Sequence, residues 1–176
     1  MNRWILLLRG VSQTGKNRVP MPAFREALTR AGFQNTRTWI QSGNALVETP
    51  KGREETRLLA EKALKEDVGA DILVIVKTAE DIRRALAGNP FPGLDSARVF
   101  YGFYNEAPSP QKAAPLLETD FGEDRLALGA DAVYTYIPGS AARTRLTTDF
   151  LQRKLGTPLA FRSRNTLGKL LEMAGE

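Results

Sequence analysis

The chain has 176 residues and a formal net charge of +5 at pH 7, and its 42% hydrophobic and 26% charged residues are the balance of an ordinary folded protein. It contains neither cysteine nor histidine. Disulfide scaffolds, thiolate catalysis, Ser-His-Asp hydrolysis and metal sites built from cysteine or histidine are therefore excluded, and we expect no metal and no cofactor.

The first half of the chain predicts four strands and two helices. The apolar run at residues 4–8 indicates a buried strand, and Pro20 and Pro22 suit the entry of a helix that ends at Gly32. The predicted elements are a strand at 4–8, a helix at 21–31, strands at 36–41 and 45–48, a helix at 53–67 and a strand at 71–77. Their order, βαββαβ, is that of a ferredoxin-like plait.

The middle of the chain holds the clearest break. Thr78 and Asp81 have the spacing of a helix-capping pair and begin a short helix through Ala87, and the Asn-Pro-Phe-Pro-Gly stretch at 89–93 follows it. After this break the order nearly repeats, with strands at 98–104, 124–128, 132–137 and 159–162 and helices at 109–117, 148–155 and 165–173. A second βαββαβ unit with an extra terminal helix is therefore expected.

The predicted fold class is α+β, with two ferredoxin-like (α/β plait, βαββαβ) lobes packed together. The first lobe covers residues 1–77, a linker helix and loop cover 78–93, and the second lobe with its extra C-terminal helix covers 94–176. A lone plait has helices on one face of its sheet only, yet the runs at 4–8 and 72–76 are apolar on both faces. We therefore expect the other lobe to cover the open face.

Charge and hydropathy also bear on partners and location. A basic balance favours phosphate, nucleotide or nucleic acid as a partner. No apolar stretch is long enough to cross a bilayer, and the run at 4–8 is too short for a secretory signal. We expect a cytoplasmic protein that has no membrane partner, and the oligomeric state is left open.

The segment after the first strand nearly matches the phosphate loop G-x-x-x-x-G-K-[ST]. Gly10, Gly15 and Lys16 fit the pattern, but Asn17 replaces the hydroxyl that would bind magnesium. Prolines also separate Lys16 from the next helix, whereas a true phosphate loop begins its helix at the lysine. A flexible loop with a surface lysine is the favoured interpretation.

Two further polar segments can present hydrogen bonds to a ligand. Gln41, Ser42 and Asn44 surround Gly43 at a tight hairpin turn, and a purely structural turn is the simpler interpretation. The segment at 162–166 precedes the last helix, where two guanidiniums beside helix N-terminal amides would form an anion site. The alternative there is a helix capped by Ser163 or Asn165 with two solvated arginines.

Several short segments spread over nearly the whole chain form a recognisable combination. They are Leu8-Arg9-Gly10, Gly15-Lys16-Asn17, Met21, Thr38, Gln41-Ser42-Gly43-Asn44 and the late Arg162/Asn165-Thr166 cluster. This combination resembles the bacterial family catalogued as domain of unknown function 1697. The resemblance implies a pair of ferredoxin-like lobes and no established activity. The family's late motif runs roughly Arg-Asn-Trp-Asn-Thr, and Arg164 stands at its aromatic position here.

Three functions remain open from the sequence. The favoured one is a binding protein for an anionic or phosphorylated ligand, either a nucleotide or a nucleic acid. The second is an enzyme that acts on such a ligand without histidine or cysteine, and the third is a protein interaction module with no small ligand. No catalytic residue is assigned. The candidate ligand-binding residues are Arg9, Gly10, Lys16, Asn17, Gln41, Ser42, Asn44, Arg162, Arg164, Asn165 and Thr166.

Overall fold

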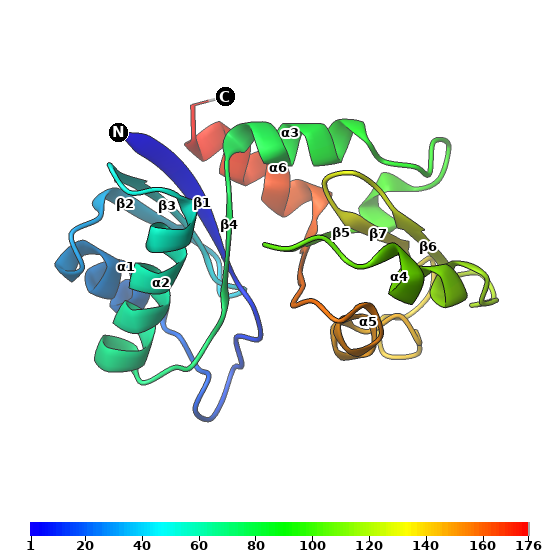
Figure 1. Cartoon of the computed structure of the whole chain (residues 1–176), viewed down its shortest axis with the longest axis horizontal. Coiled ribbons are helices and arrows are strands. Elements are labelled where there is room, and N and C mark those ends of the chain that lie inside the picture. Colours follow the sequence, from blue (N-terminus) through cyan, green and yellow to red (C-terminus); the bar gives the residue numbers. More distant parts are fainter. Residues whose placement is uncertain (176) are drawn as a thin grey trace. The chain divides into compact units, whose positions relative to one another are not determined.

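The computed structural model describes residues 1–175 and divides them into two compact α+β units (Figure 1). The first unit is Met1–Ala79 together with the segment from Leu170 onward, and the second is Glu80–Lys169. Each unit contains one four-stranded sheet in which all neighbouring strands are antiparallel. None of the helices within the described residues has the length and apolar character needed to cross a bilayer.

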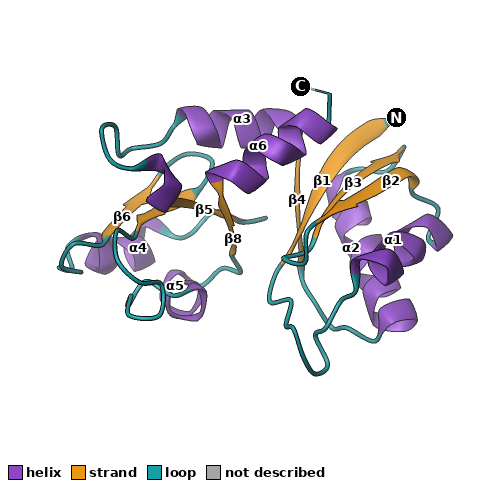
Figure 2. Cartoon of the chain, turned by 180° about the vertical axis from the view of Figure 1, so that it is seen from behind, coloured by secondary structure: helices purple, strands orange, loops and turns teal. Residues whose placement is uncertain are grey.

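The first unit places two helices on one face of its sheet (Figure 2). Its sheet order is β2-β3-β1-β4. Leu6, Phe24 and Leu64 belong to the apolar core between the helices and the sheet. The elements are β1 (Asn2–Leu8), α1 (Met21–Arg30), β2 (Gln34–Trp39), β3 (Asn44–Thr49), α2 (Arg53–Ala63), the π-helical turn η1 (Leu64–Val68) and β4 (Val74–Lys77).

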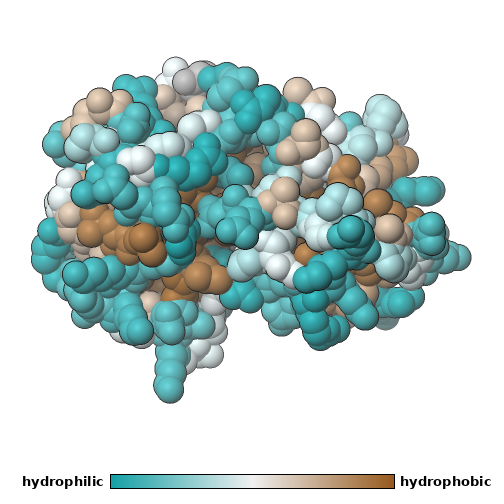
Figure 3. Space-filling model, viewed as in Figure 1, coloured by the Kyte–Doolittle hydropathy of each residue, from teal (hydrophilic) through white to brown (hydrophobic). Residues whose placement is uncertain are grey.

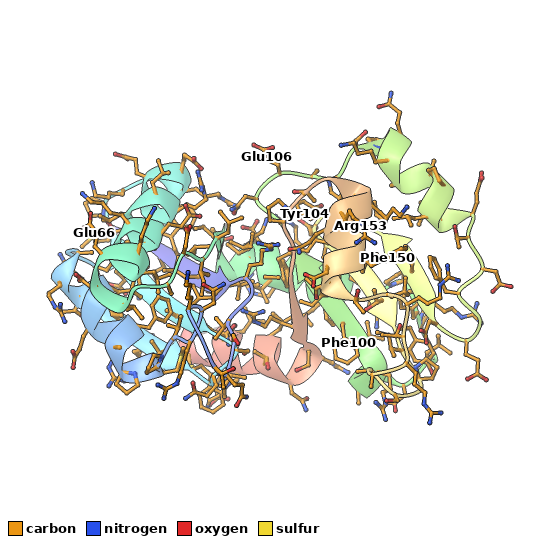
Figure 4. All side chains as sticks on the ribbon, turned by 90° about the horizontal axis from the view of Figure 1, so that it is seen from below. Glu66, Phe100, Tyr104, Glu106, Phe150 and Arg153 are labelled. Carbon is orange, nitrogen blue, oxygen red and sulfur yellow. The ribbon has the colours of Figure 1, made fainter. Side chains whose placement is uncertain are left out.

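The second unit repeats this arrangement. Its sheet order, β6-β7-β5-β8, places each strand as in the first sheet. Leu151 and Leu116 pack in its core, and Figure 4 shows Phe150 and Arg153 on α5, where the Arg153 guanidinium carbon lies 5.9 Å from the centre of the Phe150 ring. The elements are α3 (Ala79–Ala87), the 3-10 turn η2 (Ser96–Arg98), β5 (Val99–Phe103), α4 (Pro110–Leu117), β6 (Arg125–Leu128), β7 (Val133–Tyr136), α5 (Thr148–Leu155), β8 (Ala160–Ser163) and α6 (Arg164–Met173).

The predicted α+β class with two lobes is confirmed, and the units divide the chain differently from the predicted boundaries. The helix expected as a linker packs with the second unit, because the Tyr134 hydroxyl donates to the Ala85 carbonyl at 2.8 Å. The end of α6 groups with the first unit, where Arg3 Nη1 donates to the Ala174 carbonyl at 3.3 Å. The strand predicted at 71–77 begins only at Val74.

Tyr134 provides a pH-dependent test of packing in the second unit. Burial raises the pKa of its hydroxyl to about 12 from the ordinary 10.0, with smaller contributions from Asp131, Tyr101 and Tyr104. The folded state therefore keeps this proton to a higher pH than the unfolded chain does. We expect the free energy of unfolding to fall by roughly 2 kcal/mol as pH rises from about 10 to about 12 because of this group alone.

The variant Tyr134→Phe isolates this contribution, because phenylalanine has no proton to lose. Urea unfolding at a series of alkaline pH values is expected to give a flatter pH profile for the variant than for the wild type. The variant also loses the hydrogen bond to Ala85, so it starts from a lower stability at pH 7. Parallel pH profiles for the two proteins would show that the hydroxyl ionises as easily folded as unfolded.

Candidate anion-binding site

The end of β1 and the turn between β2 and β3 lie at the same edge of the first sheet. Leu7 pairs with Asn44 in the β1–β3 register, and the Leu8 amide donates to the Gly43 carbonyl at 2.8 Å. Figure 1 shows the loop after β1 leaving the sheet at the end where the β2–β3 turn lies. This placement follows from antiparallel β1–β3 pairing, as the sequence predicted. We call residues 9–18 and 40–43 together the rim.

The turn of the rim is built around a buried amide. Asn44 is fully buried, and its Nδ2 donates to the Trp39 carbonyl and to Ser42 Oγ, each at 3.0 Å. Gly43 has φ +87°, and a Cβ added to it would lie 2.7 Å from Leu8 Cβ. The amide of Asn44 therefore holds the turn, which leaves Ile40, Gln41 and Ser42 as the exposed residues of this segment.

The loop of the rim closes on itself. The Ser12 amide donates to the Asn17 carbonyl at 2.8 Å, and the Arg18 amide donates to the Gly15 carbonyl at 3.3 Å. Ser12 Oγ donates to the Thr14 carbonyl at 2.6 Å. Lys16 is exposed on this loop, and the loop stands out as a projection in Figure 3. Arg9 is half-buried where the loop leaves β1, and its amide donates to the Leu73 carbonyl at 3.1 Å.

The rim is cationic and contains no carboxylate. Arg9, Lys16 and Arg18 are its three charged residues. Among the residues that the structure describes, Lys16 and Arg18 form no ion pair, and the amides of Gly15, Lys16 and Asn17 donate to no protein acceptor. Cationic side chains beside solvent-facing amides are the groups that proteins use to bind phosphate.

The near-match to a phosphate loop has a different structural context. Helix α1 begins at Met21, well beyond Lys16, and Pro20 is its N-cap. The neighbouring strands are antiparallel, whereas the phosphate loop belongs to parallel sheets with βαβ units. The loop therefore lacks the sheet and helix context of that motif.

The late candidate cluster belongs to the second unit. Ser163 Oγ accepts from the Thr166 amide at 3.3 Å, so the first turn of α6 is capped by a side chain. Arg164 is exposed and donates from Nη1 to Ser96 Oγ at 3.0 Å, and Asn165 is exposed. Arg162 is buried and donates from Nη1 to the Phe161 carbonyl at 2.9 Å, and desolvation by burial lowers its pKa to about 10.

The predicted site residues therefore fall into two groups, one on each unit. Arg9, Gly10, Lys16, Asn17 and the turn residues lie in the first unit, and the segment 162–166 lies in the second. Within the first unit the structure brings the two predicted segments to one edge. Sequence reasoning passed over Arg18, and counting charges along residues 9–18 would have found it.

A comparison with known families identifies the chain. The profile of the family described as protein of unknown function (DUF1697) matches residues 1–134. The chain belongs to this family. The match to this DUF1697 chain includes the whole rim and stops before the segment 162–166.

A solved structure of a conserved bacterial protein from Streptococcus pneumoniae has a similar fold. It is 21% identical to this DUF1697 chain, with a TM-score of 0.76 over 99% of this chain and 98% of that one. No curated protein matches the chain.

Proposed function

We propose that this DUF1697 protein binds a phosphorylated or otherwise anionic ligand, either a nucleotide or a nucleic acid strand, at the rim of its first unit. The observation that carries the proposal is the combination of three cations, no carboxylate and a loop whose amides at 15–17 face no protein acceptor. We also propose that each unit is a ferredoxin-like plait. The βαββαβ element order and the β2-β3-β1-β4 strand order support that assignment.

The expected strength follows from the number of charged contacts. A hydrogen bond to a charged group contributes about 1.5–3 kcal/mol, so two or three of them supply about 3–9 kcal/mol. Before the cost of association this corresponds to a complex no tighter than roughly micromolar, and that cost weakens it further. Lys16 and Arg18 are exposed, and binding an anion would displace only water from them. A nucleic acid strand would gain more than a single phosphate, because it can engage both cations at once and release counterions.

The affinity for a short fluorescent single-stranded oligonucleotide, with pyrophosphate as competitor, tests this proposal. Lys16→Ala and Arg18→Ala are each expected to weaken binding about tenfold at low salt and to make the salt dependence shallower. Fluorescence anisotropy at several salt concentrations gives both quantities.

Matched controls remove the same charges elsewhere in the first unit. Lys51 is exposed at the opposite end of β1, where its carbonyl accepts from Asn2 Nδ2 at 3.0 Å, and Arg25 is exposed on α1. Lys51→Ala and Arg25→Ala are expected to change affinity by less than about twofold. If these controls weaken binding as much as the rim variants do, the protein attracts anions only through its net charge.

A further inference from the structure

Strand β6 has an open backbone edge in the second unit. It is the outermost strand of the β6-β7-β5-β8 order, at the margin of the sheet in Figures 1 and 2. The Gly129 amide donates to the Ala132 carbonyl at 2.9 Å, and the Ile137 amide donates to the Arg98 carbonyl at 3.0 Å. The first bond joins the ends of β6 and β7, and the second shows that the Ile137 amide faces β5. Because hydrogen bonding alternates along antiparallel strands, the two bonds fix which β6 residues are hydrogen-bonded to β7.

Leu126 and Leu128 are the β6 residues whose backbone groups point away from β7. The alternation assigns the β6–β7 hydrogen bonds to Arg125 and Ala127. No partner for the amides or carbonyls of Leu126 and Leu128 exists among residues 1–175. These groups have the spacing that a further strand needs for pairing.

Two edges of the first sheet are blocked by devices that β6 lacks. At β2, the register with β3 breaks between Gln34 and Arg37. At β4, the Val74 amide donates to Glu61 Oε1 at 3.0 Å, and the Val76 carbonyl accepts from Arg53 Nη1 at 3.2 Å. Bulges and capping side chains are the usual protection of edge strands against pairing. The regular, uncapped edge of β6 is therefore a specific feature of the second unit.

A hollow of about 220 Å³ borders the first half of β6. Leu117, at the end of α4, is 49% exposed and lines this hollow together with Leu116. Phe91, Phe121 and Leu126 add apolar lining, and Asp120, Asp124 and Arg125 add charged groups around it. Partners that bind by strand addition gain affinity from backbone hydrogen bonds and specificity from pockets that hold alternate side chains. The hollow is placed to take one apolar side chain of such a strand.

The charge beside the hollow selects the partner. Residues 118–124 contain four carboxylates, Glu118, Asp120, Glu123 and Asp124, in a chain whose net charge is +5. In the described part of the chain none of the four forms an ion pair, although Asp124 Oδ2 accepts from Thr144 Oγ1 at 2.6 Å. Two cations lie beside the same loop: Arg125 lines the hollow, and the Arg145 guanidinium carbon lies 5.1 Å from the centre of the Phe121 ring. The four carboxylates outnumber them, so an extended segment with basic side chains complements this loop.

We propose that β6 and the adjoining hollow form a docking site for an extended basic segment of a partner protein. The segment pairs with Leu126 and Leu128, places an apolar side chain against Leu117, and sets lysine or arginine side chains beside residues 118–124. This site is independent of the rim and carries the opposite charge preference.

Amide hydrogen exchange in the full chain tests the pairing at single residues. The probe is a blocked hexapeptide in which lysine alternates with leucine. In the free protein, the Leu126 and Leu128 amides are expected to exchange quickly while the Ala127 amide is protected by β7. Saturating peptide is expected to slow exchange at Leu126 and Leu128 at least tenfold and to leave Ala127 unchanged.

Two substitutions test the edge and the hollow separately. Leu128→Pro removes an outward amide without breaking a hydrogen bond to β7, and Leu117→Arg fills the hollow with a cation. Each is expected to weaken peptide binding at least tenfold. Leu58→Arg changes a leucine that is 52% exposed on α2 and is the matched control, with no effect expected.

Three results would overturn the docking site. One is peptide binding that leaves exchange at Leu126 and Leu128 unchanged. Another is equal affinity for a peptide with glutamate in place of lysine. The last is slow exchange without peptide that strengthens with protein concentration, because this would assign the edge to a second copy of the chain.

Discussion

Replacing Gly43 by alanine is expected to lower the free energy of unfolding of the first unit by about 3 kcal/mol. Gly43 has φ +87°, where a residue with a Cβ is strained, and its added Cβ would lie 2.7–2.9 Å from three side-chain carbons of Leu8. Leu8 is buried in the core of the first unit and is hydrogen-bonded to the same turn, so it has little room to move. Urea denaturation followed by circular dichroism measures the change.

Gly93→Ala is the matched control for this prediction. Gly93 has a similar φ of +83°, but no atom lies within 4 Å of its added Cβ. Its substitution therefore carries only the backbone term, about 1 kcal/mol. If Gly43→Ala costs no more than Gly93→Ala, the close approach of the turn to Leu8 is not a constraint on the rim.

Asn44→Asp is expected to cost about 3 kcal/mol of unfolding free energy at pH 7. The substitution keeps the shape of the side chain and replaces the Nδ2 donor by an acceptor facing the Trp39 carbonyl, in a fully buried position. Burial also raises the pKa of the introduced carboxyl. The variant is therefore expected to regain stability as pH falls toward about 4, because the protonated carboxyl can donate.

Ser42→Ala separates the two hydrogen bonds of this amide. It removes the Ser42 Oγ acceptor of this amide and leaves the bond to Trp39. We expect a loss of about 1 kcal/mol of unfolding free energy that is the same at pH 4 and at pH 7. Thermal unfolding of both variants at the two pH values gives the comparison. A pH-independent Asn44→Asp defect would mean that the amide donor does not hold the turn.

Local signals predicted the elements of this fold well. Pro20 and Gly32 marked the ends of α1, and the helix predicted at 148–155 has the bounds of α5. The hydrophobic pattern placed the start of β4 too early, at residue 71. The apolar run already includes Ile72 and Leu73, but the register of β4 with β1 begins only at Val74. The boundary between units was also beyond reach, since it depends on contacts such as Tyr134 with Ala85.

The sequence predicted where the candidate site lies better than it predicted what each of its residues does. Antiparallel pairing alone placed the loop after β1 beside the 42–44 turn. The sequence did not show that the amide of Asn44 points into the turn, whereas the cap of α6 by Ser163 was one of the two alternatives that it offered. Arg162 looked like a surface cation, but it lies opposite Tyr101 on β5 and is buried. Both outcomes depend on tertiary packing, which a short motif does not encode.

A titration of the isotope-labelled chain with pyrophosphate, followed through its backbone amide resonances, tests anion binding at the rim most directly. Binding there predicts that the largest shifts fall on Gly15, Lys16 and Asn17, with smaller ones at Gln41 and Ser42, and that Lys16→Ala reduces all of them together. Anion binding at the rim would be contradicted if the largest shifts fell at the start of α6, around Arg164. It would also be contradicted if millimolar pyrophosphate gave no saturable shifts.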